Sequence, residues 1–291
     1  MKILVIGGLG TWGRNHVRTL SCFKNIKVET ATRQNWKELI SRKPSGVIIC
    51  TGPEQHVEIA LEAVRHAVPV LIEKPVSLNL VAARQLNDAV TKANFSPVLV
   101  NNIHLFSPAY EKLVELVRLS GPVTRIFSMG SNWGPFRDYS SLYDYGPHDI
   151  SMCLYLLNET PRIYATSVRN IKLPHPFWHG AKVITDERPQ LFGFGLGFKD
   201  CKARVQVGNG SIKKFRYFEV RTQDDTIIYD DTAAEKLTLN GRAVMIVNTN
   251  PLESVLDRFI MSINGYRDDR FGMELNLKVM ETLQTIEDKI G

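Results

Sequence analysis

Apolar runs alternate with amphipathic stretches through the first hundred positions of the chain. Residues 2–6 form a branched apolar run that breaks at glycine, and helical spacing follows with Val17 and Leu20. The alternation continues, with strands expected at 27–32, 47–50, 68–72 and 98–100 and helices at 36–42, 57–64 and 79–93. Strands that alternate with helices predict an α/β fold with a doubly wound parallel sheet.

The pattern changes around residues 101–107. A helix is expected to begin at Ser107-Pro108 and to stop at Gly121, because a capping residue followed by proline favours a helix start and glycine favours a stop. A loop is expected at 133–145 and a helix at 150–157. Alternating strands between 162 and 239 predict a large open mixed or antiparallel sheet, and amphipathic helices near 252–263 and 273–289 close the chain. Domains are therefore expected at 1–103 and 104–291, the second of α+β type.

The composition is that of an ordinary globular protein. Of 291 residues 44% are hydrophobic and 23% charged, and the formal charge is +6. The densest basic cluster, residues 213–216, is interpreted as a solvated strand or turn, so nucleic-acid binding is not expected. A mild positive balance suits anionic ligands such as a dinucleotide or a nucleotide sugar. Four widely spaced cysteines suggest free thiols in a reducing compartment, and the first apolar run is too short to span a membrane, so a cytoplasmic location is expected.

Gly8, Gly10 and Gly13 form a G-x-G-x-x-G motif between the first strand and the first helix. In a dinucleotide-binding turn, Gly8 permits the tight turn, Gly10 lets the backbone approach a pyrophosphate, and Gly13 lets the helix pack close to the strand. The helix start then offers free N–H groups to the phosphates. The alternative is an ordinary glycine-rich turn.

Two further motifs carry candidate chemistry. Glu73-Lys74-Pro75 follows a buried strand, at the edge where open α/β sheets bind ligands; the alternative is a surface strand end. Asp144 and His148 stand at the start of a predicted helix, where a histidine can take a proton and a carboxylate can orient it. These two residues are equally compatible with a capped loop, and Asp149 with a first-turn carboxylate.

The motifs together resemble the glucose–fructose oxidoreductase / inositol dehydrogenase (Gfo/Idh/MocA) family over nearly the whole chain. The matching motifs are Gly8-x-Gly10-x-x-Gly13, Thr51-Gly52-Pro53-x-x-His56, Glu73-Lys74-Pro75 and Asp144-x-Gly146-x-His148. Other stretches, such as Phe106-Ser107-Pro108-Ala109 and Tyr229-Asp230-Asp231-Thr232, resemble the branch that acts on nucleotide sugars in surface-polysaccharide biosynthesis.

The resemblance implies a Rossmann domain that binds NAD or NADP and a second domain that binds substrate and pairs with another subunit in a homodimer or homotetramer. It implies hydride transfer between a sugar carbon and nicotinamide, with three catalytic residues, Lys74, Asp144 and His148, in the cleft between the domains. His148 would take the hydroxyl proton, Asp144 would orient it, and Lys74 would stabilise the alkoxide. The implied cofactor-binding residues are Gly8, Gly10, Thr11, Trp12, Gly13, Thr32, Arg33, Thr51, Gly52, Pro53, His56, Glu73 and Lys74.

Three departures from the family pattern matter. Thr32-Arg33 replaces the acid that binds the ribose, which slightly favours NADP over NAD. Residues 34–46 leave room for only one crossover helix, since the helix and strand that usually follow are missing. Ser151 stands where the family usually has an acid, as is common in the nucleotide-sugar branch.

Other candidates have weaker support. His175 and His179 are four apart, but Pro176 disfavours a helix and no third ligand is evident, so no metal site is expected. Trp133 and Arg137 either contact substrate or merely pack. The sequence thus predicts an NAD(P)-dependent oxidoreductase of a sugar or nucleotide sugar. The alternatives are a cofactor-binding regulator or pseudoenzyme, and a ketoreductase of another small carbonyl compound.

Overall fold

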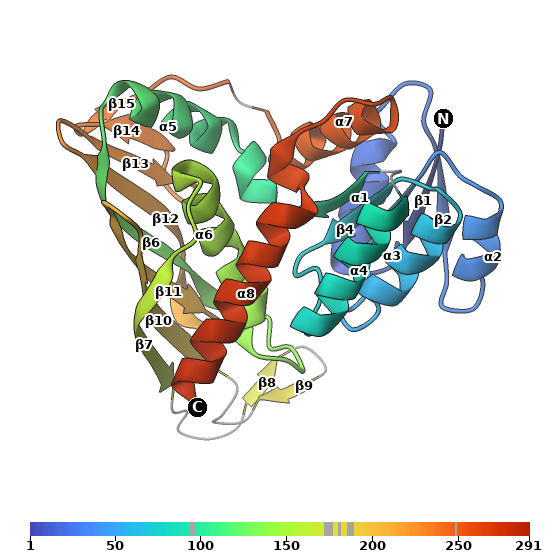
Figure 1. The fold of residues 1–291 in the computed structure, drawn as a ribbon, viewed down its shortest axis with the longest axis horizontal. Helices are drawn as coiled ribbons and strands as arrows, with labels where there is room; N and C mark the ends of the chain where they lie inside the picture. The colour runs from blue at the N-terminus through green and yellow to red at the C-terminus, as the bar shows by residue number, and fades with distance from the viewer. Residues whose placement is uncertain (94–96, 172–176, 180–181, 185–188, 248) are drawn as a thin grey trace. The chain divides into compact units, whose positions relative to one another are not determined.

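The computed structural model describes residues 1–93, 97–171, 177–179, 182–184, 189–247 and 249–291 (Figure 1). The chain forms two compact units. Unit 1 comprises Met1–Ser107 and Thr249–Met280, and unit 2 comprises Pro108–Asn248 and Glu281–Gly291. In the described part of the chain, no helix combines the length and the apolar character that crossing a membrane requires.

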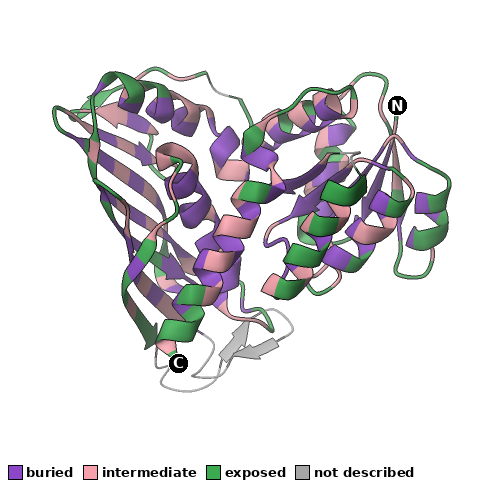
Figure 2. Cartoon of the chain, viewed as in Figure 1, coloured by how far each residue is buried: buried purple, intermediate pink, exposed green. Residues whose placement is uncertain are grey.

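Unit 1 is built on a five-stranded parallel sheet of order β2-β1-β3-β4-β5. The strands are β1 (Lys2–Ile6), β2 (Lys27–Ala31), β3 (Gly46–Ile49), β4 (Val70–Glu73) and β5 (Val98–Asn101). The helices between them are α1 (Thr11–Leu20), α2 (Trp36–Ser41), α3 (His56–Arg65) and α4 (Leu80–Ala93). Every residue of β3, β4 and β5 is buried (Figure 2), as continuous apolar runs in a sheet covered on both faces require.

A segment from the end of the chain completes the core of unit 1. After the short helix η1 (Ile103–Phe106), this unit resumes with α7 (Pro251–Ile263), η2 (Asp269–Phe271) and the start of α8 (Met273–Ile290). A Cβ added at Gly46 would lie 2.9 Å from side-chain atoms of both Phe259 and Ile263, so α7 packs directly on β3. The Phe271 ring stacks on Phe106 at 4.3 Å, and the Asn102 amide donates to Asn276 at 3.0 Å.

Unit 2 contains an eight-stranded mixed sheet of order β15-β14-β13-β12-β6-β11-β10-β7. Its strands are β6 (Val123–Trp133), β7 (Arg162–Asn170), β10 (Gln190–Gly197), β11 (Lys202–Gly208), β12 (Gly210–Thr222), β13 (Thr226–Asp230), β14 (Leu237–Leu239) and β15 (Arg242–Ala243). Neighbouring strands are antiparallel except β6 and β11, which run parallel. Two short strands, β8 (Phe177–His179) and β9 (Lys182–Ile184), form a separate pair.

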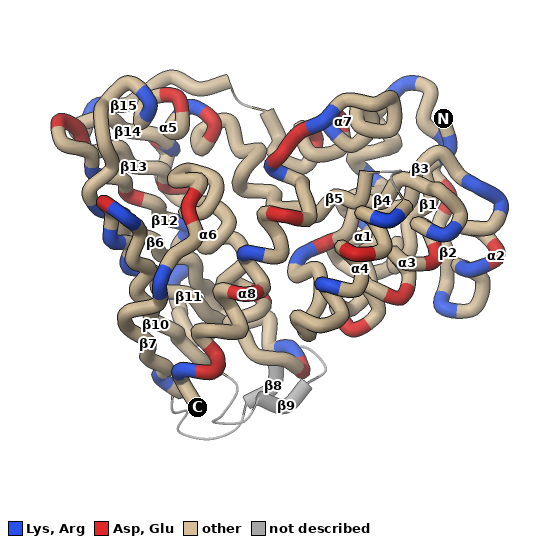
Figure 3. The backbone as a smooth tube through the Cα atoms, viewed as in Figure 1, with Lys and Arg blue, Asp and Glu red and all other residues tan. Residues whose placement is uncertain are grey.

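Helices α5 (Pro108–Leu119) and α6 (Ser141–Leu157) cover one face of this sheet (Figure 1). The Tyr110 hydroxyl joins them by donating to the carbonyl of Met152 at 2.7 Å, and the Tyr110 ring meets Phe218 edge-on at 5.9 Å. Along each strand, the residues that alternate with those under the two helices point to the opposite face of the sheet. Lys202, Arg125 and Arg221 lie opposite one another in register across β11, β6 and β12, a basic row on strands where Figure 3 shows Lys and Arg.

The α/β class, the parallel sheet and the large second sheet are as the sequence predicts, and the missing βα unit leaves β2 at the edge of its sheet. Two details differ. The predicted loop 133–145 is wrong in part, since α6 already begins at Ser141. The basic cluster 213–216 is solvated only at its lysines, because Arg216 is 6% exposed. Of the candidate pair His175 and His179, His175 lies outside the described residues.

Candidate active site

The turn after β1 carries the motif glycines. Gly7 takes a φ of +83°, a left-handed conformation that favours glycine, so the tight turn predicted at Gly8 is made at Gly7. Gly8 instead packs against Thr30, whose Cγ2 would lie 2.8 Å from an added Cβ. The Gly10 amide donates to the Gly7 carbonyl at 3.0 Å, and Gly10 is the N-cap of α1.

The other two glycines meet different surroundings. A Cβ on Gly13 would lie 2.2 Å from the Gly7 carbonyl oxygen, so no side chain fits there. A Cβ on Gly10 would meet only that oxygen among the described atoms, at 3.3 Å, and Gly10, Thr11 and Trp12 are exposed. The first turn of α1 contains no acidic residue. Its free N–H groups and positive dipole end therefore fit the pyrophosphate of a dinucleotide.

The end of β2 offers a cation. Asn35 Oδ1 accepts hydrogen bonds from the Thr32 amide at 2.8 Å and from its hydroxyl at 3.0 Å, so the Thr32 side chain is turned into its own loop. Arg33 is exposed, and with Trp36 and Lys37 it lines a cavity of about 340 Å³. Lys37 pairs with Glu58 at 3.2 Å, whereas Arg33 has no acidic partner in the part of the chain that the structure describes.

His56 links the loops that follow β3 and β4. Its Nδ1 lies 2.8 Å from the carbonyl oxygen of Pro75, and its Nε2 lies 3.1 Å from that of Thr51. Burial lowers the pKa of His56 more than these carbonyl contacts raise it, so the imidazole is neutral and donates to one of them at a time. The residues between, Gly52 and Pro53, form the turn into α3.

Glu73 and Lys74 stand at the carboxyl end of β4. Glu73 pairs in register with Asn101 of β5, and its Oε1 accepts hydrogen bonds from His16 Nε2 at 2.6 Å and from Asn101 Nδ2 at 2.8 Å. Burial raises the pKa of the Glu73 carboxyl, but the bonds from His16 and Asn101 and the charge of Lys74 lower it overall, which keeps it ionised. Lys74 is half-buried and precedes a cis bond to Pro75.

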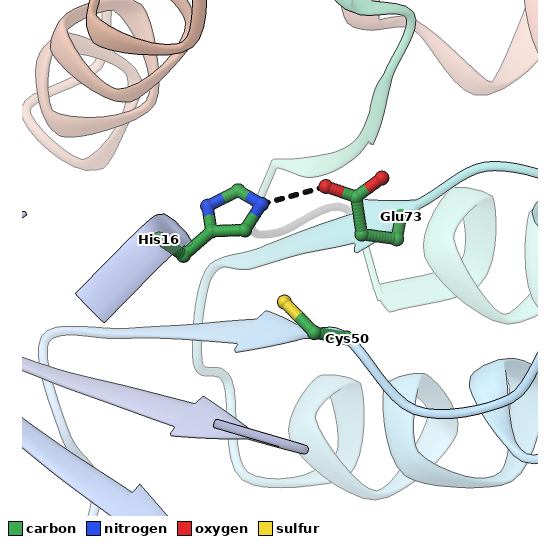
Figure 4. A group of neighbouring side chains, drawn as sticks. All are labelled: His16, Cys50 and Glu73. Atoms are coloured by element: carbon green, nitrogen blue, oxygen red, sulfur yellow. Dashed lines mark hydrogen bonds and ion pairs between the residues drawn. The ribbon is translucent and has the colours of Figure 1, made fainter. Parts of the chain in front are cut away.

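Figure 4 shows His16, Cys50 and Glu73 converging at this edge of the sheet. Their potential ligand atoms lie within 4.8 Å of one another, which makes them a candidate metal group among the described residues. However, the His16–Glu73 separation of 2.6 Å is a hydrogen-bond distance, shorter than the roughly 3.3 Å between ligand atoms of a tetrahedral zinc ion. Burial also raises the pKa of the Cys50 thiol well above its ordinary value, whereas a metal binds the thiolate. His16 and Glu73 are therefore a hydrogen-bonded pair with the Cys50 thiol close by.

Unit 2 supplies Asp144 and His148 from α6. The Ser140 hydroxyl caps this helix by accepting from the Leu142 amide at 3.2 Å, and the spacing of four residues puts Asp144 and His148 on one helical face. Asp144 is 7% exposed, and Arg137 Nε approaches its Oδ2 at 3.4 Å. His148 is half-buried, and the Ser151 hydroxyl donates to its carbonyl at 2.9 Å.

The next residue, Asp149, is fully buried and is not in the first turn of its helix. Its Oδ2 accepts from Arg216 Nη1 of β12 at 2.8 Å, and its Oδ1 accepts from the Ser128 hydroxyl of β6 at 2.5 Å. A Cβ on Gly130 would lie 2.5 Å from the carboxylate and 2.6 Å from the guanidinium, so a glycine leaves room for the pair. The pair fixes α6 to the sheet directly beside His148.

The structure thus brings the predicted cofactor residues together in unit 1, with Lys74 among them, and Asp144 together with His148 in unit 2. The sequence analysis did not identify His16, Asn101, Ser128 and Arg216 as partners of these residues. His16 does stand three residues after Gly13 on a helix, a spacing that turns it toward the sheet. Trp133 packs edge-on against Phe136 at 5.4 Å.

Comparison with known proteins bears on the family and the fold. Residues 9–101 match the sequence profile of the Gfo/Idh/MocA family, described as an oxidoreductase family with an NAD-binding Rossmann fold. A proposed oxidoreductase from Magnetospirillum magnetotacticum MS-1 has a similar structure, with a TM-score of 0.84, 26% identity and 98% of each chain covered. No curated protein matches the sequence.

More distant structures share the fold. UDP-N-acetylglucosamine 3-dehydrogenase from Acidithiobacillus ferrooxidans superposes with a TM-score of 0.79 at 17% identity, covering 100% of this chain and 97% of the other. Biliverdin reductase from Synechocystis sp. PCC 6803, solved with biliverdin and NADP⁺, gives a TM-score of 0.77 at 16% identity, covering 100% and 99%. Fold, glycine turn and family profile together define an NAD(P)-binding oxidoreductase. Residues 9–101 carry the sequence profile of the Gfo/Idh/MocA family, and the whole chain shares its fold with the structures named above.

Proposed function

We propose that the protein transfers a hydride between a nicotinamide cofactor and a ring carbon of a sugar or nucleotide sugar. The observation that carries this proposal is the placement of His148 one helical turn after Asp144 on α6. A half-buried histidine beside a buried carboxylate can accept an alcohol proton near neutral pH, which is what oxidation of a secondary alcohol requires.

The residues divide the work. The start of α1 holds the pyrophosphate, and the nicotinamide, when bound, supplies the hydride chemistry. His148 takes the hydroxyl proton, and Asp144, itself held by Arg137, orients the imidazole and stabilises its cation. Lys74 donates a hydrogen bond to the alcohol oxygen and stabilises the negative charge that develops on it.

The substrate class rests on the nucleotide-sugar motifs and on similar structures. UDP-N-acetylglucosamine 3-dehydrogenase is one, and an aldose-aldose oxidoreductase from Caulobacter crescentus, complexed with glycerol, is another. Biliverdin reductase has the same fold and a different substrate, which keeps reduction of another carbonyl compound as an alternative. Exposed Arg33 beside its cavity favours NADP over NAD, because a guanidinium pairs with a 2′-phosphate.

A cofactor-binding regulator is the second candidate. It is favoured by the reduced crossover after β2, where α2 has 6 residues and β2 is the sheet edge. A regulator would bind the dinucleotide tightly and turn over no sugar, no nucleotide sugar and no ketone.

The experiment is stopped-flow measurement of nicotinamide reduction against a panel of sugars and UDP-sugars, with wild type and His148→Asn. Loss of the general base should lower turnover by about 10²–10⁴-fold and leave dinucleotide affinity unchanged, because His148 and the phosphate-binding turn belong to different units. Turnover of His148→Asn at the wild-type rate would show that another residue is the base.

A further inference from the structure

Lys74 stands between two residues that the fold holds in place. Before it, the Glu73 carboxylate is bound by His16 and Asn101. After it, the Pro75 carbonyl lies 2.8 Å from His56 Nδ1. The backbone on both sides of this lysine is therefore fixed by buried side chains.

The side chain of His16 makes a single polar contact in this arrangement. It is 0% exposed, its Nε2 lies 2.6 Å from Glu73 Oε1, and its Nδ1 has no hydrogen-bond partner among the described residues. Burying an imidazole with one nitrogen unsatisfied is costly, so a purely apolar residue would fill this position at lower cost if packing were the whole requirement. The contact with Glu73 is what distinguishes histidine here.

The contact between His16 and Glu73 links two elements of the candidate site. His16 lies on α1, whose first residues form the phosphate-binding turn, and Glu73 immediately precedes Lys74. A short hydrogen bond between charged and polar groups holds its two partners closely. It therefore joins the helix that receives the cofactor to the strand end that presents the lysine.

We propose that His16 is a positioning residue that acts through Glu73 to hold Lys74 in its working position. This inference rests on the proposed role of Lys74 in hydride transfer. Displacing a reacting group by about 1 Å can cost on the order of 10²-fold in rate, so the contact matters far more for turnover than its own strength suggests.

The kinetic test compares His16→Leu with His16→Gln, because the glutamine amide can replace the Nε2 donor and leucine cannot. His16→Leu should lower kcat by about 10–100-fold, with the dissociation constant of the dinucleotide unchanged, and His16→Gln should restore most of kcat. His66→Leu is the matched control, since His66, the C-cap of α3 in the same unit, also pairs through Nε2 with a glutamate, Glu62, at 3.2 Å. In a double variant, His16→Leu should add little to the loss caused by Glu73→Gln. Additive losses, or a wild-type kcat in His16→Leu, would overturn the proposal.

A second readout needs no turnover. Reductive methylation with ¹³C-formaldehyde labels the lysines, and the Lys74 resonance is identified by its absence in Lys74→Arg. His16→Leu should shift or broaden this resonance, whereas His16→Gln and His66→Leu should leave it unchanged. An unchanged Lys74 resonance in folded His16→Leu would overturn the inference. A shifted resonance in a protein that oxidises no alcohol would instead leave the positioning intact and remove the proposed function.

Discussion

Gly10 and Gly13 differ in what an added side chain would meet. Substitution of Gly10 is therefore expected to affect dinucleotide binding, and substitution of Gly13 to affect folding. Valine at position 10 would press only on the Gly7 carbonyl oxygen, 3.3 Å from its Cβ, a contact that a shift of a few tenths of an ångström relieves. Because the valine would occupy the place of the pyrophosphate, Gly10→Val should abolish dinucleotide binding in a folded protein. Valine at position 13 would collide with the Gly7 carbonyl at 2.2 Å, so Gly13→Val should unfold unit 1. Calorimetric titration and circular dichroism measure the two effects. Unchanged dinucleotide affinity in Gly10→Val would place the phosphates elsewhere.

Arg33 should set the choice of cofactor. Its guanidinium is exposed beside the cavity at the end of β2, without an acidic partner among the described residues, and is available to a 2′-phosphate. We expect NADP to bind more tightly than NAD, and Arg33→Ala to narrow the difference by roughly tenfold, the worth of one charge-assisted hydrogen bond. Lys24→Ala, a change at another exposed cation of unit 1, is the control. A wild-type preference for NAD would mean that Arg33 points away from the cofactor.

At the scale of single residues, the sequence indicates candidate roles for residues that stand in a motif or at a strand end, such as Gly13 and Lys74. It cannot predict partners that only the fold brings together. Arg216 follows two solvated lysines, and nothing in that stretch indicates that alternation along β12 turns it inward to Asp149. His16 and Glu73 are likewise distant in sequence and adjacent only because α1 covers the carboxyl edge of the sheet.

Among the elements, α6 shows where local preference fails. Residues 133–145 are rich in glycine, proline and aromatic residues, so the sequence predicts a loop there, and Pro147 disfavours a helix interior. The helix begins at Ser141 because Ser140 caps it and because buried Leu142 and Ile150 pack around Gly146, next to Leu283 of α8. Tertiary burial outweighs the cost of an internal proline here. By contrast, α1, α3 and the parallel strands carry strong periodicity and lie close to their predicted positions.

The anchorage of α6 should be measurable as stability. Removing one partner of the buried Asp149–Arg216 pair leaves an uncompensated charge, so Arg216→Met should lower the free energy of unfolding by about 3–5 kcal/mol. Replacing both residues in Arg216→Met with Asp149→Leu should recover part of that loss. The exposed pair Lys112–Glu115 on α5 is the control, worth less than about 1 kcal/mol. Urea titrations would give these values, and a loss below 1 kcal/mol in Arg216→Met would contradict the anchoring role.

At the scale of the whole molecule, the open face of the eight-stranded sheet favours self-association. Its residues include Phe127, whose ring lies 6.0 Å from Tyr217, and the helices α5 and α6 cover the opposite face. A large sheet with one uncovered face needs a partner, so we expect a homodimer formed through it. Light scattering at micromolar concentration should give twice 32.9 kDa for the wild type and 32.9 kDa for Phe127→Asp.

The control for assembly is Leu119→Asp, at an apolar residue that is 85% exposed at the end of α5. This variant should remain dimeric. A monomeric wild type would exclude the assembly, and a dimeric Phe127→Asp would move the interface to another surface.

Because Thr249–Met280 belongs to unit 1, this unit cannot complete its core until that segment has been synthesised on the ribosome. Val47 and its neighbours in β3 are made early, but the α7 side chains that cover Gly46 emerge only after all of β6 to β15 has been synthesised. Likewise, the stacking of Phe106 on Phe271 and the hydrogen bond of Asn102 to Asn276 form only after this later segment has been synthesised. Nascent unit 1 therefore carries an uncovered apolar surface through most of translation, which exposes it to aggregation and makes it a substrate for chaperones. A segment that is made after nearly all of unit 2 therefore closes the unit whose strands are made first.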